Sequence, residues 1–145
     1  MSDQARQALE RTLAPRRANP TPRPPKGWVR AIRDALGMSS RELAERLGVT
    51  QQAVSQLEAA ERDGAVTIDR LEGVAQALGC RLEYALVPER PLGQMVHERA
   101  QRKAREILEP VGHSMALEGQ DVEMDDEVER LAEDLADKRG LWSPP

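Results

Sequence analysis

The chain has 145 residues, enough for one small domain with further segments attached. It contains no Phe, one Tyr and two Trp, so its core has to be built mainly from aliphatic side chains, which fits small packed helices. A single cysteine excludes a disulfide within the chain, and no apolar run approaches the ~20 residues that a membrane helix requires.

The formal net charge of −4 hides an uneven distribution along the chain. Residues 1–33 hold 8 basic and 2 acidic residues, whereas residues 113–145 hold 3 basic and 10 acidic residues. A basic front and an acidic end indicate two partners of different charge. The polar, proline-rich start shows no signal peptide, and the lone Cys80 fits a reducing compartment, so we expect a cytoplasmic protein.

The first segment, residues 1–27, combines a short helix with a basic arm. Ser2 can cap a helix over residues 2–13, whose apolar face is thin, so this helix needs a docking surface. Residues 15–27 contain five prolines, which exclude helix and favour an extended conformation. Two interpretations of this arm stay open: its basic side chains, Lys26 among them, contact phosphate, or the arm is a plain spacer.

Residues 28–79 have the pattern of a helix-turn-helix domain. Ser39 followed by Glu42 predicts a capping box, and Gly48 ends that helix where a left-handed residue is needed. Thr50 can cap the second helix. The residues predicted to face the core are Trp28 or Val29, Ile32, Leu36, Leu43, Ala44, Leu47, Val54, Leu57, Ile68, Leu71, Val74, Ala75 and Leu78.

The second helix of this pair carries side chains that both donate and accept hydrogen bonds. Such groups suit the major groove, where each base pair shows its own pattern, and Gln pairs bidentately with adenine. A solvated helix face is the alternative; the preceding helix and glycine turn favour DNA readout. The candidate DNA-contacting residues are Lys26, Ser40, Arg41, Thr50, Gln51, Gln52, Ser55 and Gln56.

The run GVTQQAVSQLE resembles the recognition segment of the phage-repressor (XRE) family, and the resemblance extends from about Trp28 to Leu78. It implies a helical domain of five helices and base contacts by the residues matching Gln51, Gln52 and Gln56. The chain departs from the family after Leu57, where AAERDGAV replaces a tighter glycine-containing turn. Loop contacts to phosphate are therefore not implied.

Residues 81–87 alternate in polarity, which predicts a short β-strand ended by Pro88. A lone strand cannot satisfy its backbone hydrogen-bonding groups, and the sequence offers no second good strand. We therefore assign residues 80–89 to pairing with a second subunit across a two-fold axis, so that the protein is a homodimer. The apolar residues of this dimerisation strand are Leu82, Tyr84 and Leu86.

Residues 90–145 form a predicted helical extension. A helix over residues 91–108 has one basic side, and a terminal helix over residues 121–139 has an apolar stripe among many acids. The stripe can pack on its own subunit or wrap a partner, and its narrowness favours wrapping. The fold class predicted for the whole chain is mainly α, with a five-helix repressor-like domain, one dimerising strand and this extension.

Between these two helices lies HSMALEGQ, which contains the pattern Ser114-x-x-x-Glu118-Gly119. The pattern resembles the inhibitory motif of Fic-protein antitoxins, and the chain over about residues 20–142 resembles the mobile mystery protein A family. The resemblance implies a Fic-domain toxin as partner, an enzyme that transfers a nucleotide from ATP to a protein hydroxyl. It also implies that Glu118 occupies the γ-phosphate space of that enzyme by pairing with its arginine.

Catalysis by this chain itself is not expected. Two isolated histidines, one cysteine and no glycine-rich phosphate loop provide no nucleophile, metal or cofactor site. We therefore expect a type II antitoxin that inhibits the toxin and represses its own operon by binding double-stranded operator DNA, and that is nucleoid-associated when bound. The alternative is a stand-alone dimeric repressor whose C-terminal helices serve only dimerisation.

Overall fold

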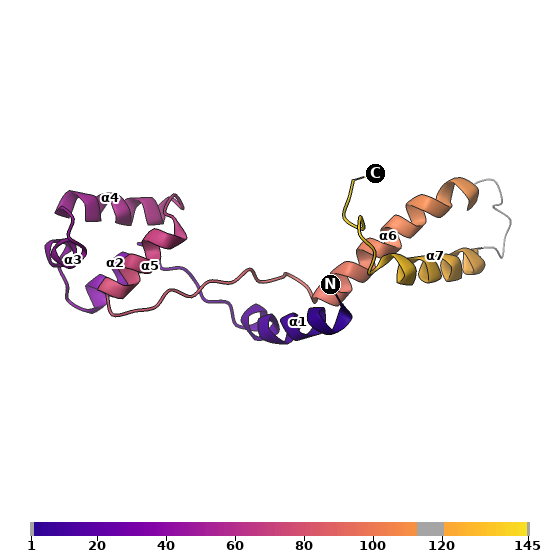
Figure 1. The fold of residues 1–145 in the computed structure, drawn as a ribbon, viewed down its shortest axis with the longest axis horizontal. Coiled ribbons are helices and arrows are strands. Elements are labelled where there is room, and N and C mark those ends of the chain that lie inside the picture. The colour runs from indigo at the N-terminus through magenta and orange to yellow at the C-terminus, as the bar shows by residue number, and fades with distance from the viewer. Residues whose placement is uncertain (1, 113–120, 145) are drawn as a thin grey trace. The chain divides into compact units, whose positions relative to one another are not determined.

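A computed structural model describes residues 2–112 and 121–144. In these residues the chain forms seven helices, with no strand. Figure 1 shows them in chain order: α1 (Asp3–Ala18), α2 (Trp28–Ala35), α3 (Ser40–Leu47), α4 (Gln51–Arg62), α5 (Ile68–Ala77), α6 (Leu92–Gly112) and α7 (Asp121–Leu135). None of the helices in this part of the chain is both long and apolar enough to cross a membrane.

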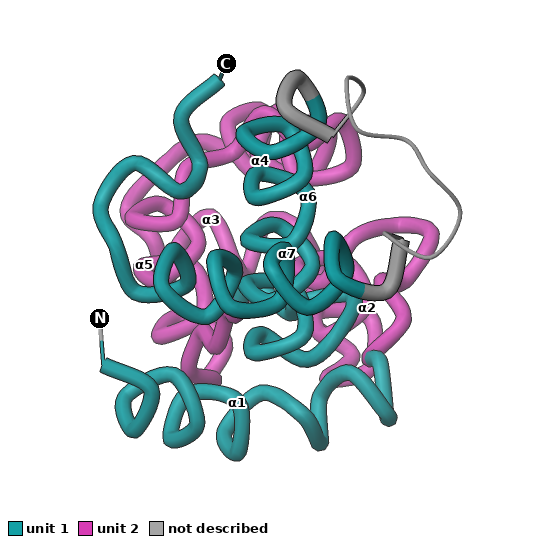
Figure 2. Tube along the Cα trace, turned by 90° about the vertical axis from the view of Figure 1, so that its right-hand side faces the viewer, with its two compact units in different colours: residues 1–20, 86–145 teal, residues 21–85 magenta. Residues whose placement is uncertain are grey.

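The helices form two compact units, coloured separately in Figure 2. The inner unit, Thr21–Ala85, contains α2 to α5. The terminal unit combines Met1–Pro20 with Leu86–Pro145 and contains α1, α6 and α7. The inner unit is therefore an insertion in the terminal unit, because the chain leaves the terminal unit after α1 and returns to it before α6.

The core of the inner unit is aliphatic, as its composition requires. Most of the residues predicted to face inward do so, and Leu43 and Val54 are fully buried. Leu36 and Ile68 were predicted to lie inward and are instead 56% and 48% exposed. Leu36 turns outward because α2 ends at Ala35. The buried cluster comprises Val29, Leu43, Ala44, Val54, Leu57, Val74 and Leu78.

The local signals that delimit α3, α4 and α5 are confirmed. Ser39 Oγ accepts a hydrogen bond from the Glu42 N–H at 3.1 Å, and the Glu42 carboxylate accepts one from the Ser39 N–H at 2.7 Å. Gly48 has φ +69°, the left-handed conformation that favours glycine. Thr50 and Thr67 cap α4 and α5 through their hydroxyl groups.

The recognition helix α4 is longer than expected, because the predicted loop after Leu57 is helical as far as Arg62. Two glutamates in this extra part, Glu58 and Glu61, are each only 5% exposed. Burial of a carboxylate is costly unless the group is paired and hydrogen-bonded. Both are: Glu58 binds Arg33 of α2, and Glu61 binds the first backbone N–H groups of α2.

The end of the inner unit also differs from expectation. After α5 the chain has no regular secondary structure over residues 80–88, so this unit has four helices and not five. The alternating polarity of residues 81–87 and the following proline do not support a fifth helix. The strand predicted here is not formed in the single chain, where the described residues provide no partner strand, and pairing between two copies stays a prediction.

The terminal unit is built on the packing of α7 against α6. Ala100, Ala104 and Ala132 are fully buried at this contact, and small side chains allow the two helices to approach closely. The apolar stripe of α7 is therefore covered by α6, which corrects the expectation that it wraps a partner. Leu141, after α7, completes this core at 5% exposed.

The N-terminal helix α1 continues to Ala18, beyond the predicted end at residue 13, with Pro15 inside it. An interior proline removes one hydrogen bond and costs about 3 kcal/mol. Arg17, in the turn after this proline, pairs with Glu10 and donates to the Pro88 carbonyl oxygen. The extended arm therefore begins after Ala18, and the earlier prediction of an arm starting at residue 15 was wrong.

Candidate nucleic-acid interface

The outer face of α4 presents the polar residues singled out in the sequence. Gln51, Gln52, Ser55 and Gln56 are all exposed. Val54 and Leu57 of the same helix are buried against α2, α3 and α5, which fixes the rotation of α4 about its axis. Four hydrogen-bonding side chains are consequently held on one solvent-facing surface of a rigid helix.

Part of this surface is already organised by hydrogen bonds. Gln51 Nε2 donates to Ser40 Oγ at 2.9 Å, which links the start of α4 to the start of α3. The Ser55 hydroxyl donates to the Gln51 carbonyl oxygen at 3.3 Å, and Thr50 Oγ1 accepts from the Ala53 N–H at 3.1 Å. In the described part of the chain, Gln52 and Gln56 form no side-chain hydrogen bond, so both amides are available to a ligand.

The N-terminal ends of α3 and α4 supply the charge of this surface. Arg41 is exposed, and its Nε atom lies 3.5 Å from Glu45 Oε1. Such a solvent-exposed ion pair is weak, so a phosphate can take the place of the Glu45 carboxylate. The backbone N–H of Ser39, followed by its hydroxyl, holds the pKa of Glu42 below its usual range. Glu42 is therefore anionic, and its carboxylate is occupied by the capping hydrogen bond from the Ser39 N–H. The exposed backbone N–H groups of a helix start also attract phosphate.

Lys26 lies elsewhere. The arm before α2 is fastened to the C-terminal end of α4, because Arg23 donates to the Glu61 carbonyl oxygen and the Glu61 carboxylate accepts from the Trp28 and Val29 N–H groups at 2.7 Å. Lys26 therefore lies beside the end of α4, whereas Ser40 and Arg41 lie near its start. The predicted DNA-contacting set divides into two groups.

The close packing of this junction explains one glycine. Gly27 has φ +84°, and a Cβ atom there would lie 2.6 Å from Glu61 Oε2. Any other residue would displace the carboxylate from the start of α2. Gly27 thus keeps the arm and α4 in contact.

Three residues that hold α4 against α2 were not predicted from the sequence: Arg33, Glu58 and Glu61. Arg33 Nε donates to Glu58 Oε1 at 3.0 Å, and its Nη2 donates to Glu58 Oε2 at 3.2 Å. Arg33 also donates to the Met38 carbonyl oxygen at 3.0 Å. A signal for the glutamates was available, since positions 54, 57, 58 and 61 form one helical face.

The other predicted site residues are distributed as follows. Ser114, Glu118 and Gly119, the proposed toxin-inhibitory residues, lie outside the described residues. Tyr84 and Leu86 of the proposed dimerisation strand are 70% and 90% exposed, and Leu82 is half-buried.

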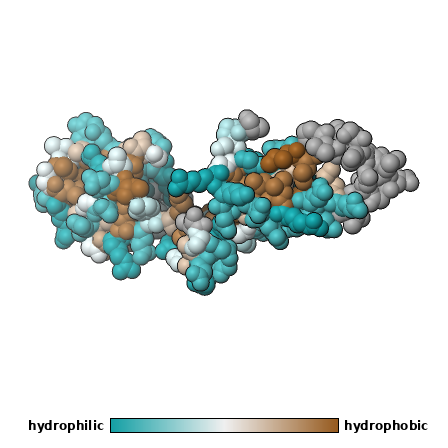
Figure 3. Space-filling view, turned by 45° about the vertical axis from the view of Figure 1, so that its right-hand side comes forward, coloured by the Kyte–Doolittle hydropathy of each residue, from teal (hydrophilic) through white to brown (hydrophobic). Residues whose placement is uncertain are grey.

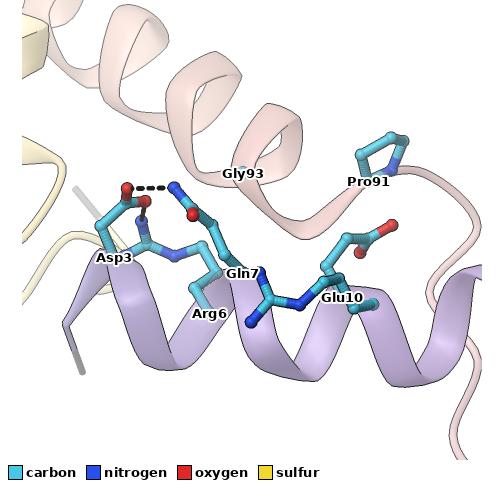
Figure 4. Close-up of a pocket in the computed structure, with 7 residues that line it drawn as sticks. Asp3, Arg6, Gln7, Glu10, Pro91 and Gly93 are labelled. Carbon is cyan, nitrogen blue, oxygen red and sulfur yellow. Dashed lines mark hydrogen bonds and ion pairs between the residues drawn. The ribbon is translucent and has the colours of Figure 1, made fainter.

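The terminal unit contains a shallow cavity of about 360 Å³ beside α1. Figure 4 shows that Asp3, Arg6 and Glu10 of α1 line it together with Pro91 and Gly93 at the start of α6. These charged side chains already have partners: Arg6 pairs with Asp3 and Asp137, and Glu10 with Arg17. Among the residues that the structure describes, no cluster of His, Cys, Asp or Glu could hold a metal ion.

Comparison with known proteins agrees with the geometry of the inner unit. Residues 29–84 match the model of a family described as helix-turn-helix, a span that begins within α2 and ends beyond α5. Searches of curated proteins and of solved structures returned no match. Residues 29–84 of this chain are therefore an XRE-type helix-turn-helix domain, which implies that the protein binds DNA.

Proposed function

We propose that this protein is a sequence-specific transcriptional repressor that reads the major groove with α4. The observation that carries the proposal is the free polar face of this helix, on which Gln52 and Gln56 are exposed and have no side-chain partner in the described residues. Each amide can pair with an adenine edge. The linked pair Gln51–Ser40 stands beside them and stiffens the start of the helix.

The two basic groups around α4 suit the DNA backbone. Arg41 at the start of α3 and Lys26 near the end of α4 are exposed. They are positioned for phosphate contacts at the two ends of the recognition helix. Phosphate contacts add affinity and salt dependence, whereas base contacts add sequence preference. The protein would act at the nucleoid, by binding and not by catalysis, with no cofactor.

Selection of bound duplexes from a random library tests this proposal. The wild type should enrich one motif, and Gln52→Ala should lower the preference for the correct base at one position by about 1–3 kcal/mol. Gln76→Ala, on the exposed side of α5, is the matched control and should leave the motif unchanged. Equal retention of all sequences by the wild type would refute sequence-specific repression.

A second function, inhibition of a Fic-domain toxin, is supported by the pattern Ser114-x-x-x-Glu118-Gly119. In the sequence, this segment lies between α6 and α7, two helices that pack against each other. In this proposal the protein is an antitoxin that also represses its own operon. Glu118 would pair with the arginine that holds the γ-phosphate of ATP in the toxin.

Co-expression with the neighbouring gene product separates the two functions. An antitoxin should co-purify with a Fic protein and suppress its nucleotidyl transfer, and Glu118→Ala should restore the transfer while leaving DNA binding intact. Glu123→Ala, an exposed acidic residue of α7, is the control and should keep the suppression. A protein that purifies alone as a dimer and binds its operator tightly would instead be a stand-alone repressor.

A further inference from the structure

Residues 81–87 connect the two units and have no regular secondary structure. In the described part of the chain, no backbone N–H or C=O group of this segment forms a hydrogen bond within the protein. The backbone bonds nearest to it are Cys80 N–H to Ala75 O and, after it, Met95 N–H to Pro91 O. Seven consecutive residues with free donors and acceptors form an edge that another strand can join.

The side chains of this segment alternate between an apolar face and a mixed face. In an extended strand, Leu82, Tyr84 and Leu86 point to one face. Tyr84 and Leu86 are 70% and 90% exposed, although both are large and apolar. On the opposite face Arg81 and Glu83 form an exposed ion pair at 3.3 Å. This face also carries Ala85 and Val87, so only the face of Leu82, Tyr84 and Leu86 is apolar at every position.

We propose that residues 81–87 pair antiparallel with the same residues of a second copy, with the two-fold axis passing through Tyr84. The occupant of the edge is thus a second subunit. The inference rests on the proposed function in one respect, because a symmetric repressor places its two recognition helices about 34 Å apart, one DNA turn. The pairing itself depends only on the segment described above.

Alternative registers are less favourable. An axis between two residues is excluded, because directly opposite residues of an antiparallel pair lie on the same face, whereas this register would pair residues of opposite faces. An axis at Glu83 would place the two Glu83 carboxylates directly opposite each other, which is destabilising. An axis at Ala85 would place Leu82 opposite Pro88, which has no N–H to donate.

The Tyr84 register avoids each of these conflicts. It uses all seven residues of the segment and leaves Pro88 outside the ladder. The two tyrosines face each other across the axis, and each Leu82 lies opposite Leu86 of the partner subunit. At each end of the ladder, Arg81 lies opposite Val87 of the partner subunit.

Disulfide trapping tests the register. In a Cys80→Ala background, single cysteines would replace Glu83, Tyr84 or Ala85, and cross-linking under mild oxidation would be followed on non-reducing gels. Directly opposite residues lie about 4.5–5.5 Å apart at Cα, within the range of a disulfide, whereas diagonal ones lie about 7–8 Å apart. The Tyr84→Cys variant should cross-link at least about tenfold faster than the other two, given this geometry.

Faster cross-linking of Glu83→Cys or Ala85→Cys would overturn the Tyr84 register. No cross-link in any variant, with a monomer mass for the wild type in sedimentation, would overturn pairing between copies. It would leave this edge to a different partner strand.

Proline substitution tests the strand pairing without introduced cysteines. Successive N–H groups of a strand point in opposite directions, so either Tyr84→Pro or Ala85→Pro removes two symmetry-related ladder bonds. The affected variant should raise the dimer dissociation constant at least about 30-fold, since each bond contributes about 1 kcal/mol. Thr21→Pro, in the other connection, is the control and should dimerise like the wild type.

Unchanged dimerisation of both variants would refute the strand pairing. A trapped dimer that enriches no DNA motif would refute the repressor proposal and leave the pairing intact, so the two failures are distinguishable.

Discussion

In both units a glutamate caps the start of a helix, but the two glutamates are buried to different extents. In each, a glutamate distant in sequence binds the first N–H groups of a helix: Glu61 caps α2 in the inner unit, and Glu10 caps α6 in the terminal unit. Glu61 is 5% exposed and accepts two bonds of 2.7 Å, whereas Glu10 is half-buried and accepts one of 3.0 Å from Leu92. The same cap should therefore contribute more stability in the inner unit.

The hydrophobic core is also larger in the inner unit than in the described part of the terminal unit. The buried core of the inner unit consists mainly of Val and Leu, whereas three of the five buried core residues in the described part of the terminal unit are alanines. Helix α1 buries none of its residues and is held by ion pairs and polar contacts such as Arg6 with Asp137. Both units also expose apolar side chains between hydrophilic ones (Figure 3). The comparison indicates that the inner unit has larger buried side chains than the described part of the terminal unit.

The largest effect should come from removing Arg33. Arg33→Met leaves the Glu58 carboxylate buried without its partner, which should destabilise the inner unit by about 3–5 kcal/mol in chemical denaturation. The double variant Arg33→Met with Glu58→Leu should recover much of this loss, because it removes both charges. Arg30→Met, at a more exposed arginine of α2, is the control. A loss below about 1 kcal/mol for Arg33→Met would contradict the importance of this pair.

Loss of the Glu61 cap should be the next largest effect. Glu61→Ala removes two charge-assisted hydrogen bonds to the start of α2, and we expect a loss of about 2–3 kcal/mol. Amide exchange of Trp28 and Val29 should increase more than that of α5. If amide exchange instead increased equally across the inner unit, Glu61 would stabilise the fold without acting on α2 in particular.

Removal of Glu10 should have a smaller effect. Glu10→Ala removes one bond to Leu92 and the pair with Arg17, so we expect about 1 kcal/mol, measured by exchange of the first amides of α6. Since charged contacts hold α1, the exchange of its amides should rise with salt concentration. Glu61→Ala having a smaller effect than Glu10→Ala would reverse the order of the two caps.

The smallest effect concerns Glu42 and pH. Its pKa is lowered mainly by the Ser39 N–H, so its stabilisation is complete above the pH where an unfolded glutamate ionises, about 4.3. This stabilisation is lost as the pH falls through the lower folded pKa. The stability difference between wild type and Glu42→Gln should shrink over that range. An NMR titration that places the Glu42 pKa at or above its ordinary value would exclude the cap.

Much of the inner unit could be predicted because its signals are local. The capping box at Ser39, the turn at Gly48 and the spacing of Leu43, Val54 and Leu57 lie within twenty residues of one another. They were sufficient to place the helix-turn-helix and the exposed face of α4. The family match over residues 29–84 confirms that domain.

The missed features depend on distant partners. Glu58 and Glu61 are buried because groups 25 to 33 residues away neutralise or bind them, and sequence spacing does not show that distance. Likewise α1 extends past Pro15 with the support of Pro88, 71 residues from Arg17. The stripe of α7 is buried by α6, whereas its narrowness in the sequence had favoured the wrapping of a partner.

The insertion of one unit in the other has a consequence for folding during synthesis. The inner unit is one continuous stretch of chain, Thr21–Ala85, so it can fold while the ribosome is still adding α6. Helix α1 is synthesised before the inner unit, but its partners come later: Leu92, which binds Glu10, follows 82 residues after it, and Asp137, which binds Arg6, follows 131 residues after it. The helix-turn-helix domain can therefore be folded in the nascent chain well before the partners of α1 have been synthesised.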